Sequence, residues 1–251
     1  MVIKLGGAAL KKSLEDSDLF QILAGVRTPV VIVHGGGPEI NKLSAALGLQ
    51  AEFSEGQRVT TNDVLAVVEM VLRGKIAPKL VRGLLAAGRS AVAISGCDGA
   101  LFECAPEQAH LGRVGHVAKM NDKLLRELLR LGHIVIISPV GLFPDGGACN
   151  VNADLAASKV AEVLGAKRLL FLTDKDGILN AKGDLLRALS RTELEKLVQS
   201  AGVTGGMKVK ARAMLELASR HPNCQIEVMN GLDGRALRLA IQGRAAGTRL
   251  E

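Results

Sequence analysis

The chain has 251 residues, of which 48% are hydrophobic, and a formal net charge of +7 at pH 7. This is enough apolar material to bury a full core, as one large domain or two lobes. No apolar run is long enough to span a membrane, and the chain has no Trp or Tyr on which bases could stack. The positive charge therefore favours a small anionic substrate or an acidic partner, and we expect neither nucleic acid nor a membrane as partner.

Cysteine usage and the first residues indicate a cytoplasmic protein. A Gly-Gly pair at positions 6 and 7 comes before any apolar core of a signal peptide could form. The cysteines lie far apart, without a CxxC pair, and are typical of small core residues in a reducing compartment. They are Cys97, Cys104, Cys149 and Cys224.

The chain begins with a predicted strand at residues 1–5, which Gly6 and Gly7 end, and a helix is expected over 8–23. Lys4 falls near the carboxyl end of that strand, at the edge where open α/β sheets bind ligands. A lysine at this position can also extend its head into solvent. Its position alone therefore does not establish a site.

Residues 30–37, with the sequence VVIVHGGG, combine a β-branched strand with three glycines directly after His34. Helical spacing resumes from Pro38, and a proline suits the first turn of a helix. A strand, a glycine turn and a helix N-terminus present backbone N–H groups to an anion without side chains in the way. A tight turn without a ligand would use the same residues, so this segment is a candidate that the rest of the chain must support.

Two segments then lead into helices. Residues 51–59 are predicted to be extended, and residues of N-cap type at 60–63 precede a helical run over 64–72. Gly74 and Pro78 interrupt this run. The pattern therefore predicts two separate helices.

The middle of the chain alternates between strands and helices. A buried strand is expected at 91–95 and a hairpin over 100–117. Asn121 is the predicted N-cap of a leucine-rich helix. A strand follows at 134–137, and residues 139–147 are predicted to form turns.

The C-terminal part keeps the same alternation. NVNAD at 150–154 leads into a helix over 155–164 that Gly165 ends, and a strand follows at 168–172. The remaining predicted elements are helices at 190–198, 207–219 and 235–242, a strand at 225–229 and an edge strand at 248–250.

Strands that alternate with helices, without an internal repeat, indicate a three-layer α/β/α sandwich with a mostly parallel central sheet and right-handed crossovers. A soft boundary falls near Gly165, where a hairpin-rich half gives way to a plainer βα half. We therefore expect two lobes, residues 1–165 and 166–251.

Several common catalytic motifs are absent from the sequence. It has no GxxxxGK[ST] loop, no GxGxxG after the first strand, no GxSxG and no HExxH, and its histidines lack metal-ligand spacing. What is left are glycine turns and polar side chains at strand–helix junctions, which can converge on one crevice of a doubly wound sheet. Lys4, Asp154 and Lys210 would then suit a polyphosphate. Taken singly, Asp154 also suits a helix's first turn, and Asn150 or Asn152 a loop.

Six motifs occur in order across nearly the whole chain: KLGG from Lys4, HGGGP from His34, RVT from Arg58, NVNAD from Asn150, TDKDGIL from Thr173 and GGMKVK from Gly205. With this set the chain resembles the amino acid kinase family. The resemblance implies ATP-dependent phosphorylation of the side-chain carboxylate of N-acetyl-L-glutamate to an acyl phosphate, the second step of arginine biosynthesis. It also implies that residues 1–165 bind the acyl amino acid and dimerise, and that 166–251 bind ATP.

The resemblance implies catalytic roles for three residues. Lys4 and Lys210 match the lysines that hold and neutralise the transferring phosphoryl group, and Asp154 matches the carboxylate that orients both. Alignment through the Gly-Met pair at 206 and 207 selects Lys210. Lys208, two residues nearer, is the competing candidate.

Other positions match binding residues of the family. Gly6, Gly7 and Gly36 match backbone positions near the phosphates. Gly36 and Gly37 also match positions that contact the acyl amino acid. The substrate-binding set is Gly36, Gly37, Arg58, Asn150 and Asn152. The nucleotide-binding set is Gly6, Gly7, Asp174, Lys175, Asp176, Gly177, Ile178, Leu179, Gly202, Val203 and Thr204.

The implied chemistry accounts for the absence of a catalytic base. A glutamate side chain with an unperturbed pKa of about 4.3 is already ionised at pH 7 and can attack without a base. Its difficulty is electrostatic, because an anion must approach the γ-phosphate. ATP and Mg²⁺ are therefore the expected cofactors, with Mg²⁺ bound mainly through the nucleotide and no protein cage.

The sequence leaves alternatives open for the oligomeric state, the substrate and the class of function. The predicted first strand starts at Met1, whereas in the family a preceding helix accompanies arginine-inhibited hexamers, so we expect a homodimer without arginine feedback, built mainly on residues 64–72. One alternative is a kinase for α-aminoadipate or glutamate linked to a small acidic carrier protein, which the positive charge would suit. The other is a non-catalytic amino-acid-sensing protein of the same fold.

Overall fold

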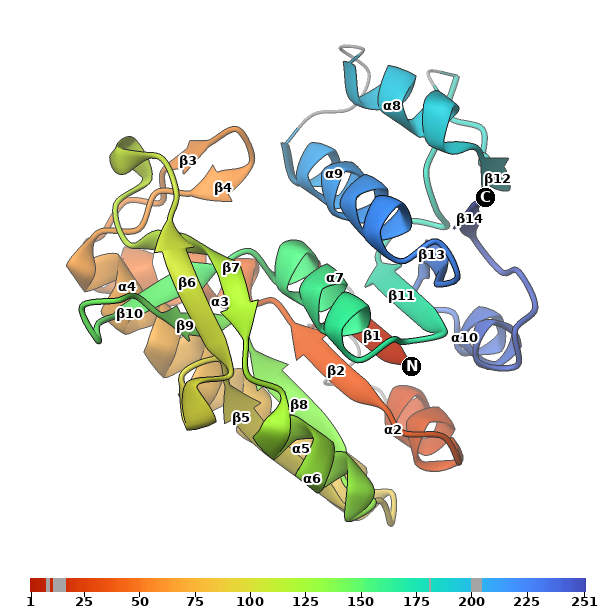
Figure 1. Cartoon of the computed structure of the whole chain (residues 1–251), viewed down its shortest axis with the longest axis horizontal. Helices are drawn as coiled ribbons and strands as arrows, with labels where there is room; N and C mark the ends of the chain where they lie inside the picture. The colour runs from red at the N-terminus through yellow and green to blue at the C-terminus, as the bar shows by residue number, and fades with distance from the viewer. Residues whose placement is uncertain (8–9, 11–16, 181, 200–204) are drawn as a thin grey trace.

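The computed structural model describes residues 1–7, 10, 17–180, 182–199 and 205–251 (Figure 1). An eight-stranded sheet forms its centre, and neighbouring strands run parallel except at β13 and β14. The strand order is β12 (Ala188–Leu189), β14 (Thr248–Leu250), β13 (Gln225–Asn230), β11 (Arg168–Thr173), β1 (Val2–Leu5), β2 (Val31–His34), β8 (Ile134–Ser138) and β5 (Ala91–Ser95). The mostly parallel sheet predicted from the sequence is confirmed.

The central strands are buried on both faces. Every residue of β1, β2 and β8 is buried, including the one lysine and the one histidine among them. Their β-branched runs suit this position because both faces of a parallel sheet are covered by helices. These strands form the core from which the functional side chains project.

Helices cover the two faces of the sheet and complete three layers (Figure 1). One apolar cluster joins one face of the sheet to α6, α7, α8 and α9, and a second joins the other face to α2, α3, α4, α5 and α10. The helix bounds are α2 (Ser17–Ala24), α3 (Gly37–Ala46), α6 (Lys123–Arg130), α7 (Ala153–Val163), α8 (Arg191–Gln199), α9 (Gly205–Arg220) and α10 (Gly234–Ile241). The predicted helix over 8–23 lies partly outside the described residues.

The two helices expected on either side of Gly74 and Pro78 form one continuous helical segment. Helix α4 (Asn62–Glu69) leads directly into the π-helix η1 (Met70–Ile76) and then into α5 (Ala77–Ala86). The N–H of Ala77 donates to the carbonyl of Leu72, five residues earlier. This change of hydrogen-bond register accommodates Pro78 in the first turn of α5, so the predicted interruption is wrong.

A small closed barrel stands beside the main sheet. Its strands are β6 (Phe102–Pro106), β7 (Val114–Met120), β9 (Val140–Leu142) and β10 (Ala148–Val151). The antiparallel pair β6–β7 confirms the hairpin predicted over 100–117. The segment 139–147, predicted to form turns, instead contains β9, which pairs with β10 and with β6.

Local capping signals were mostly correct. Thr61 caps α4 and accepts from the N–H of Val64. Ser190 and Glu193 form the predicted capping box, each accepting from the backbone N–H of the other. The predicted cap at Asn121 is wrong by one residue: Asp122 is the N-cap of α6, and the Asn121 amide donates to Gly99 O.

Smaller elements complete the fold. A short hairpin, β3 (Phe53–Ser54) and β4 (Gln57–Arg58), lies in the segment predicted to be extended. Strand β14 is not the edge of the sheet, because β12 pairs with it on the outside. The 3-10 turn η2 (Asp98–Ala100) precedes the β6–β7 hairpin, and a second 3-10 turn, η3 (Ala109–Leu111), lies in the loop between its strands.

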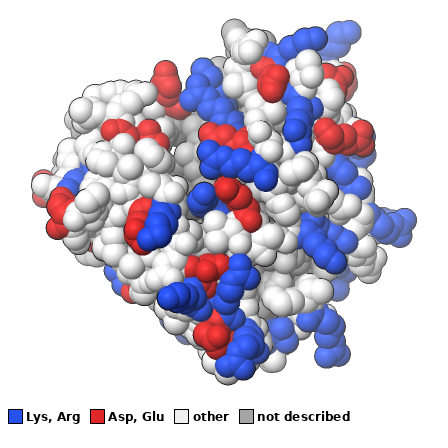
Figure 2. All heavy atoms as spheres, viewed as in Figure 1, with Lys and Arg blue, Asp and Glu red and all other residues white. Residues whose placement is uncertain are grey.

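The sheet passes through both predicted lobes. Strand β1 pairs with β2 on one side and with β11, from beyond residue 165, on the other. The division into 1–165 and 166–251 therefore stays a prediction. Basic and acidic side chains are interspersed over much of the face in Figure 2. Across the described residues, no helix has both the length and the apolar composition needed to cross a membrane.

The two glycines of the segment from α4 to α5 provide a test of its packing. A Cβ at Gly83 would overlap the ring of Phe20, whereas a Cβ at Gly74 would meet nothing within 4 Å. Gly83→Ala is expected to lower the free energy of unfolding by about 1–2 kcal/mol because the ring must move. Gly74→Ala is expected to raise it by about 0.5–1 kcal/mol through helix propensity. Urea denaturation of both variants measures this, and equal effects would contradict the packing.

Candidate functional site

The candidate site lies at the carboxyl ends of the central strands. Because β1, β2 and β11 are parallel neighbours, their carboxyl ends share one edge of the sheet. Helix α7 begins near this edge and packs against α9 (Figure 1). Segments far apart in sequence therefore meet here.

Three charged side chains meet at this edge and are almost completely buried. Lys4 on β1 places its Nζ 2.9 Å from Oδ1 of Asp154, in the first turn of α7. Lys210 on α9 places its Nζ 2.7 Å from the same oxygen. Each of the three residues is no more than 7% exposed. We refer to Lys4, Asp154 and Lys210 as the lysine–aspartate cluster.

This geometry distinguishes Lys210 from Lys208. Lys210 is buried with Asp154, and its ammonium lies 4.9 Å from the centre of the Phe171 ring. Lys208, two residues earlier on the same helix, is only partly buried. Residues two apart on a helix point in different directions, so one of these lysines at a time can face Asp154.

Burial and charge shift the titration of the cluster. Burial alone would raise the pKa of Asp154, but Lys210 and Lys4 together hold it at about 2. Burial lowers the pKa of Lys210 to about 8, although the attraction of Asp154 opposes this. At pH 7 the carboxylate is therefore ionised and Lys210 carries its proton.

The glycine turns lie directly beside this cluster. A Cβ at Gly6 would collide with the ammonium of Lys4. A Cβ at Gly36 would lie 2.6 Å from Leu72 Cδ2 and 2.7 Å from Ile76 Cδ1. Gly36 is the N-cap of α3 and supplies no side-chain cap. A side chain at either position would therefore displace its neighbours, and at Gly6 it would displace the ammonium of Lys4.

His34 fixes the start of the second glycine turn. Its ring is fully buried, and burial lowers its pKa to about 4, so it is neutral at pH 7. Nδ1 lies 3.0 Å from Gly35 O and Nε2 lies 2.9 Å from Ser138 Oγ. Ser138 Oγ in turn lies 3.3 Å from Leu72 O. The histidine therefore joins β2, β8 and η1 behind the turn.

Arg58 forms a second polar group close to the glycine turn. Its Nη2 donates to Asn41 Oδ1 at 2.5 Å and to Gly37 O at 3.5 Å, and its guanidinium lies over the Phe53 ring. Burial lowers its pKa. Its Nη1 is buried and has no hydrogen-bond partner in the described part of the chain. An unpaired buried donor of this kind is suited to an anionic ligand.

The two predicted asparagines have different surroundings. Asn150 on β10 donates its amide to Thr60 Oγ1 at 3.1 Å, and Thr60 donates to Arg58 O at 3.0 Å. Asn152 is the N-cap of α7 and accepts from the N–H of Asp154. Asn150 is thus connected to Arg58 through Thr60, whereas Asn152 contacts the backbone of Asp154 in the lysine–aspartate cluster.

The predicted nucleotide segment follows β11. Asp174, Lys175 and Asp176 are exposed, and Asp176 accepts from Asn230 at the end of the neighbouring strand β13. The N–H of Ile178 donates to Thr248 Oγ1 at 2.8 Å. Gly177 has a φ of 159°, and Leu179 is 40% exposed. Gly202, Val203 and Thr204 lie outside the described residues, and Gly7 is exposed with a φ of 53°.

Several contacting residues were not predicted from the sequence. They are Asn41, Thr60, Ser138, Asn230 and Thr248. Ser138 had a signal, since it is the polar residue that closes the apolar run of β8. Asn41 is part of the stretch after the glycine turn. Among the described residues, no group of three or more His, Cys, Asp or Glu side chains is placed to hold a metal ion.

The chain matches the model of one protein family and is similar to named proteins. The model of the amino acid kinase family matches residues 1–230. Acetylglutamate kinase of Geobacillus kaustophilus is 44% identical over 226 residues, which cover 87% of this chain and 85% of that protein. Acetylglutamate kinase of Synechococcus sp. CC9605 is 40% identical over 244 residues, covering 94% and 82%.

Solved structures match the whole fold. A crystal structure of a Streptococcus mutans UA159 protein superposes with a TM-score of 0.84 at 26% identity, covering 99% of this chain and 97% of that one. The family model spans most of the chain, and both relatives are at least 40% identical to it over most of their length. The chain therefore belongs to the amino acid kinase family.

Proposed function

We propose that this protein transfers the γ-phosphoryl group of ATP to the side-chain carboxylate of N-acetyl-L-glutamate, which gives an acyl phosphate. The observation that carries the proposal is the lysine–aspartate cluster, with two ammonium groups on one buried carboxylate at the ligand-binding edge of the sheet. The proposal is further supported by the relatives, which are acetylglutamate kinases at up to 44% identity over most of the chain. In arginine biosynthesis this is the second step.

The reaction needs charge compensation more than proton transfer. The attacking carboxylate is ionised at pH 7, so no base is required, but it must approach an anionic phosphate. Lys4 and Lys210 would hold and neutralise the transferring group, and Asp154 would keep both ammonium groups in position. Preorganised cations in a buried site act strongly because they need no reorganisation during the reaction.

The glycine turns and Arg58 would position the two substrates. Backbone N–H groups at Gly6, Gly7 and Gly36 would approach the phosphates. A Cβ would crowd its neighbours at Gly6 and Gly36, and Gly7 has a positive φ. Arg58 would bind the α-carboxylate of the acyl amino acid through its unpaired Nη1. The other proposed substrate contacts are Gly37, Asn150 and Asn152.

The nucleotide would lie beyond β11. We assign its contacts to Asp174, Lys175, Asp176, Gly177, Ile178 and Leu179, together with Gly202, Val203 and Thr204. Mg²⁺ would bind mainly through phosphate oxygens and water, which is its usual mode in kinases. The ion would neutralise phosphate charge. Residues 166–251 would then be the ATP-binding lobe and 1–165 the lobe for the acyl amino acid.

We further propose a cytoplasmic homodimer. All four cysteines are free, as expected for a reducing compartment. The dimer would form around α4 and η1, where Met70 is 51% exposed.

An assay with hydroxylamine tests the proposed reaction. With ATP, Mg²⁺ and free N-acetylglutamate, the acyl phosphate should be trapped as a hydroxamate, and omission of the acyl amino acid is the control. Turnover of carrier-linked α-aminoadipate but not of free N-acetylglutamate would support the alternative substrate. A folded protein that leaves ATP intact with either acceptor would contradict a kinase function.

Substitution of the lysines tests their roles. Lys4→Ala and Lys210→Ala are each expected to lower kcat by about 10²-fold or more, with smaller changes in KM, because their charge acts mainly on the transition state. Lys208→Ala is the matched control on the same helix and should change kcat little. Circular dichroism checks folding, and near-normal kcat in both lysine variants would contradict the assignment.

The pKa of Lys210 predicts a pH dependence. Since burial holds it at about 8 and the proton is needed for positive charge, kcat/KM should fall as the pH rises through about 8. Lys210→Arg keeps its charge at these pH values, so its profile should lack this fall even if its rate is lower. A wild-type profile that stays level to pH 9.5, or a similar fall in the arginine variant, would contradict the prediction.

A further inference from the structure

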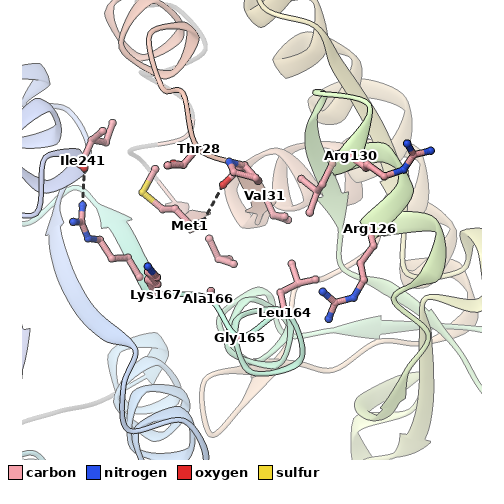
Figure 3. Close-up of a pocket in the computed structure, with 14 residues that line it drawn as sticks. Met1, Thr28, Val31, Arg126, Arg130, Leu164, Gly165, Ala166, Lys167 and Ile241 are labelled. Atoms are coloured by element: carbon pink, nitrogen blue, oxygen red, sulfur yellow. Dashed lines mark hydrogen bonds between the residues drawn. The ribbon is translucent and has the colours of Figure 1, made fainter.

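A cavity opens at the edge of the sheet opposite the candidate site. It lies at the amino ends of β1, β2 and β11, whereas the lysine–aspartate cluster lies at their carboxyl ends. Its volume is about 650 Å³, which is within the range of small-molecule sites. Figure 3 shows Lys167 and Arg126 on opposite sides of it, with Val31 and Leu164 between them.

The walls of this cavity combine apolar and basic side chains. Its apolar surface includes Val2, Val31, Leu129 and Leu164. Its polar side chains include Arg126, Arg130, Lys167 and Arg168, and none of the 14 described lining residues is acidic. The lining is therefore complementary in charge to an anion and in polarity to an aliphatic group.

The basic side chains differ in how they are held. Arg126 pairs with Asp122 and also donates from Nη2 to Val163 O at 3.0 Å. Arg168 donates from Nη1 to Ile241 O at 2.6 Å and forms no ion pair with a described residue. Lys167 is exposed, and within the described residues its ammonium has neither a hydrogen bond nor an ion pair. Positive charge on the side of Lys167 and Arg168 is thus left without a counterion.

We propose that this cavity binds a small organic anion with an aliphatic body, such as a medium-chain carboxylate. The carboxylate would lie on the side of Lys167 and Arg168, and the chain would extend over Val2, Leu129 and Leu164. Arginine side chains that are already held by hydrogen bonds lose little conformational entropy when a ligand binds. Burial of the aliphatic chain supplies affinity that a compact inorganic anion lacks.

Octanoate is a suitable probe. The protein has no Trp or Tyr, so Leu129→Trp creates the only indole and reports binding by fluorescence, while calorimetry follows the unmodified protein. Octanoate is expected to bind saturably, and octylammonium and inorganic phosphate are expected to bind at least about tenfold more weakly. Lys167→Gln should weaken octanoate binding by about fivefold. Lys79→Gln, at an exposed lysine of α5 outside the cavity, should leave it unchanged.

Three results would overturn the proposal: no saturable octanoate binding to the unmodified protein, equal binding of octylammonium, or equal binding of phosphate. An unchanged affinity in Lys167→Gln would also overturn it. The readout is binding alone and needs no ATP or acyl amino acid. Its outcome is therefore independent of the proposed kinase function.

Discussion

One carboxylate oxygen determines the geometry of the candidate site. Oδ1 of Asp154 accepts both Lys4 and Lys210, so β1, α7 and α9 must all arrive at one point. Buried charges are tolerated only when they are paired and hydrogen-bonded. Two ammonium groups on one carboxylate leave a net positive charge, which an incoming phosphate can neutralise. In the empty site one positive charge is therefore left uncompensated, and a bound phosphate would compensate it.

Packing around this oxygen depends on small residues. Helices α7 and α9 pack against each other and carry alanines that are almost fully buried in the same apolar cluster: Ala156, Ala157, Ala211 and Ala213. Ser158 donates across the same contact to Ala213 O at 3.1 Å. Larger side chains would separate the helices and withdraw Lys210 from Asp154. The composition of these helices is thus part of the site, although none of these residues would contact a substrate.

Much of the fold could be predicted because it depends on local signals. The buried strands, the cap at Thr61 and the Ser190 capping box follow from neighbouring residues. The barrel strand β9 and the continuous helix through Pro78 could not, since both depend on distant packing partners. In the site, the place of Lys4 at a strand end made it a candidate, and only the resemblance to the family gave it a role. Asn41 and Thr60 are ordinary polar residues, and only their contacts with Arg58 and Asn150 distinguish them.

The wide turn of the π-helix η1 makes two contacts behind the second glycine turn, one apolar and one polar. Its widened turn brings Leu72 and Ile76 against Gly36 and also points the Leu72 carbonyl at Ser138. A π turn holds one residue more than an α turn, so loss of a single residue from this segment would restore a regular α-helix without turning α5 relative to α4. The apolar side of α5, with Leu80 and Leu84, would stay against the core, but the widened turn that carries the Leu72 carbonyl to Ser138 would be lost. The extra residue consequently serves the polar contact behind the glycine turn and not the orientation of α5.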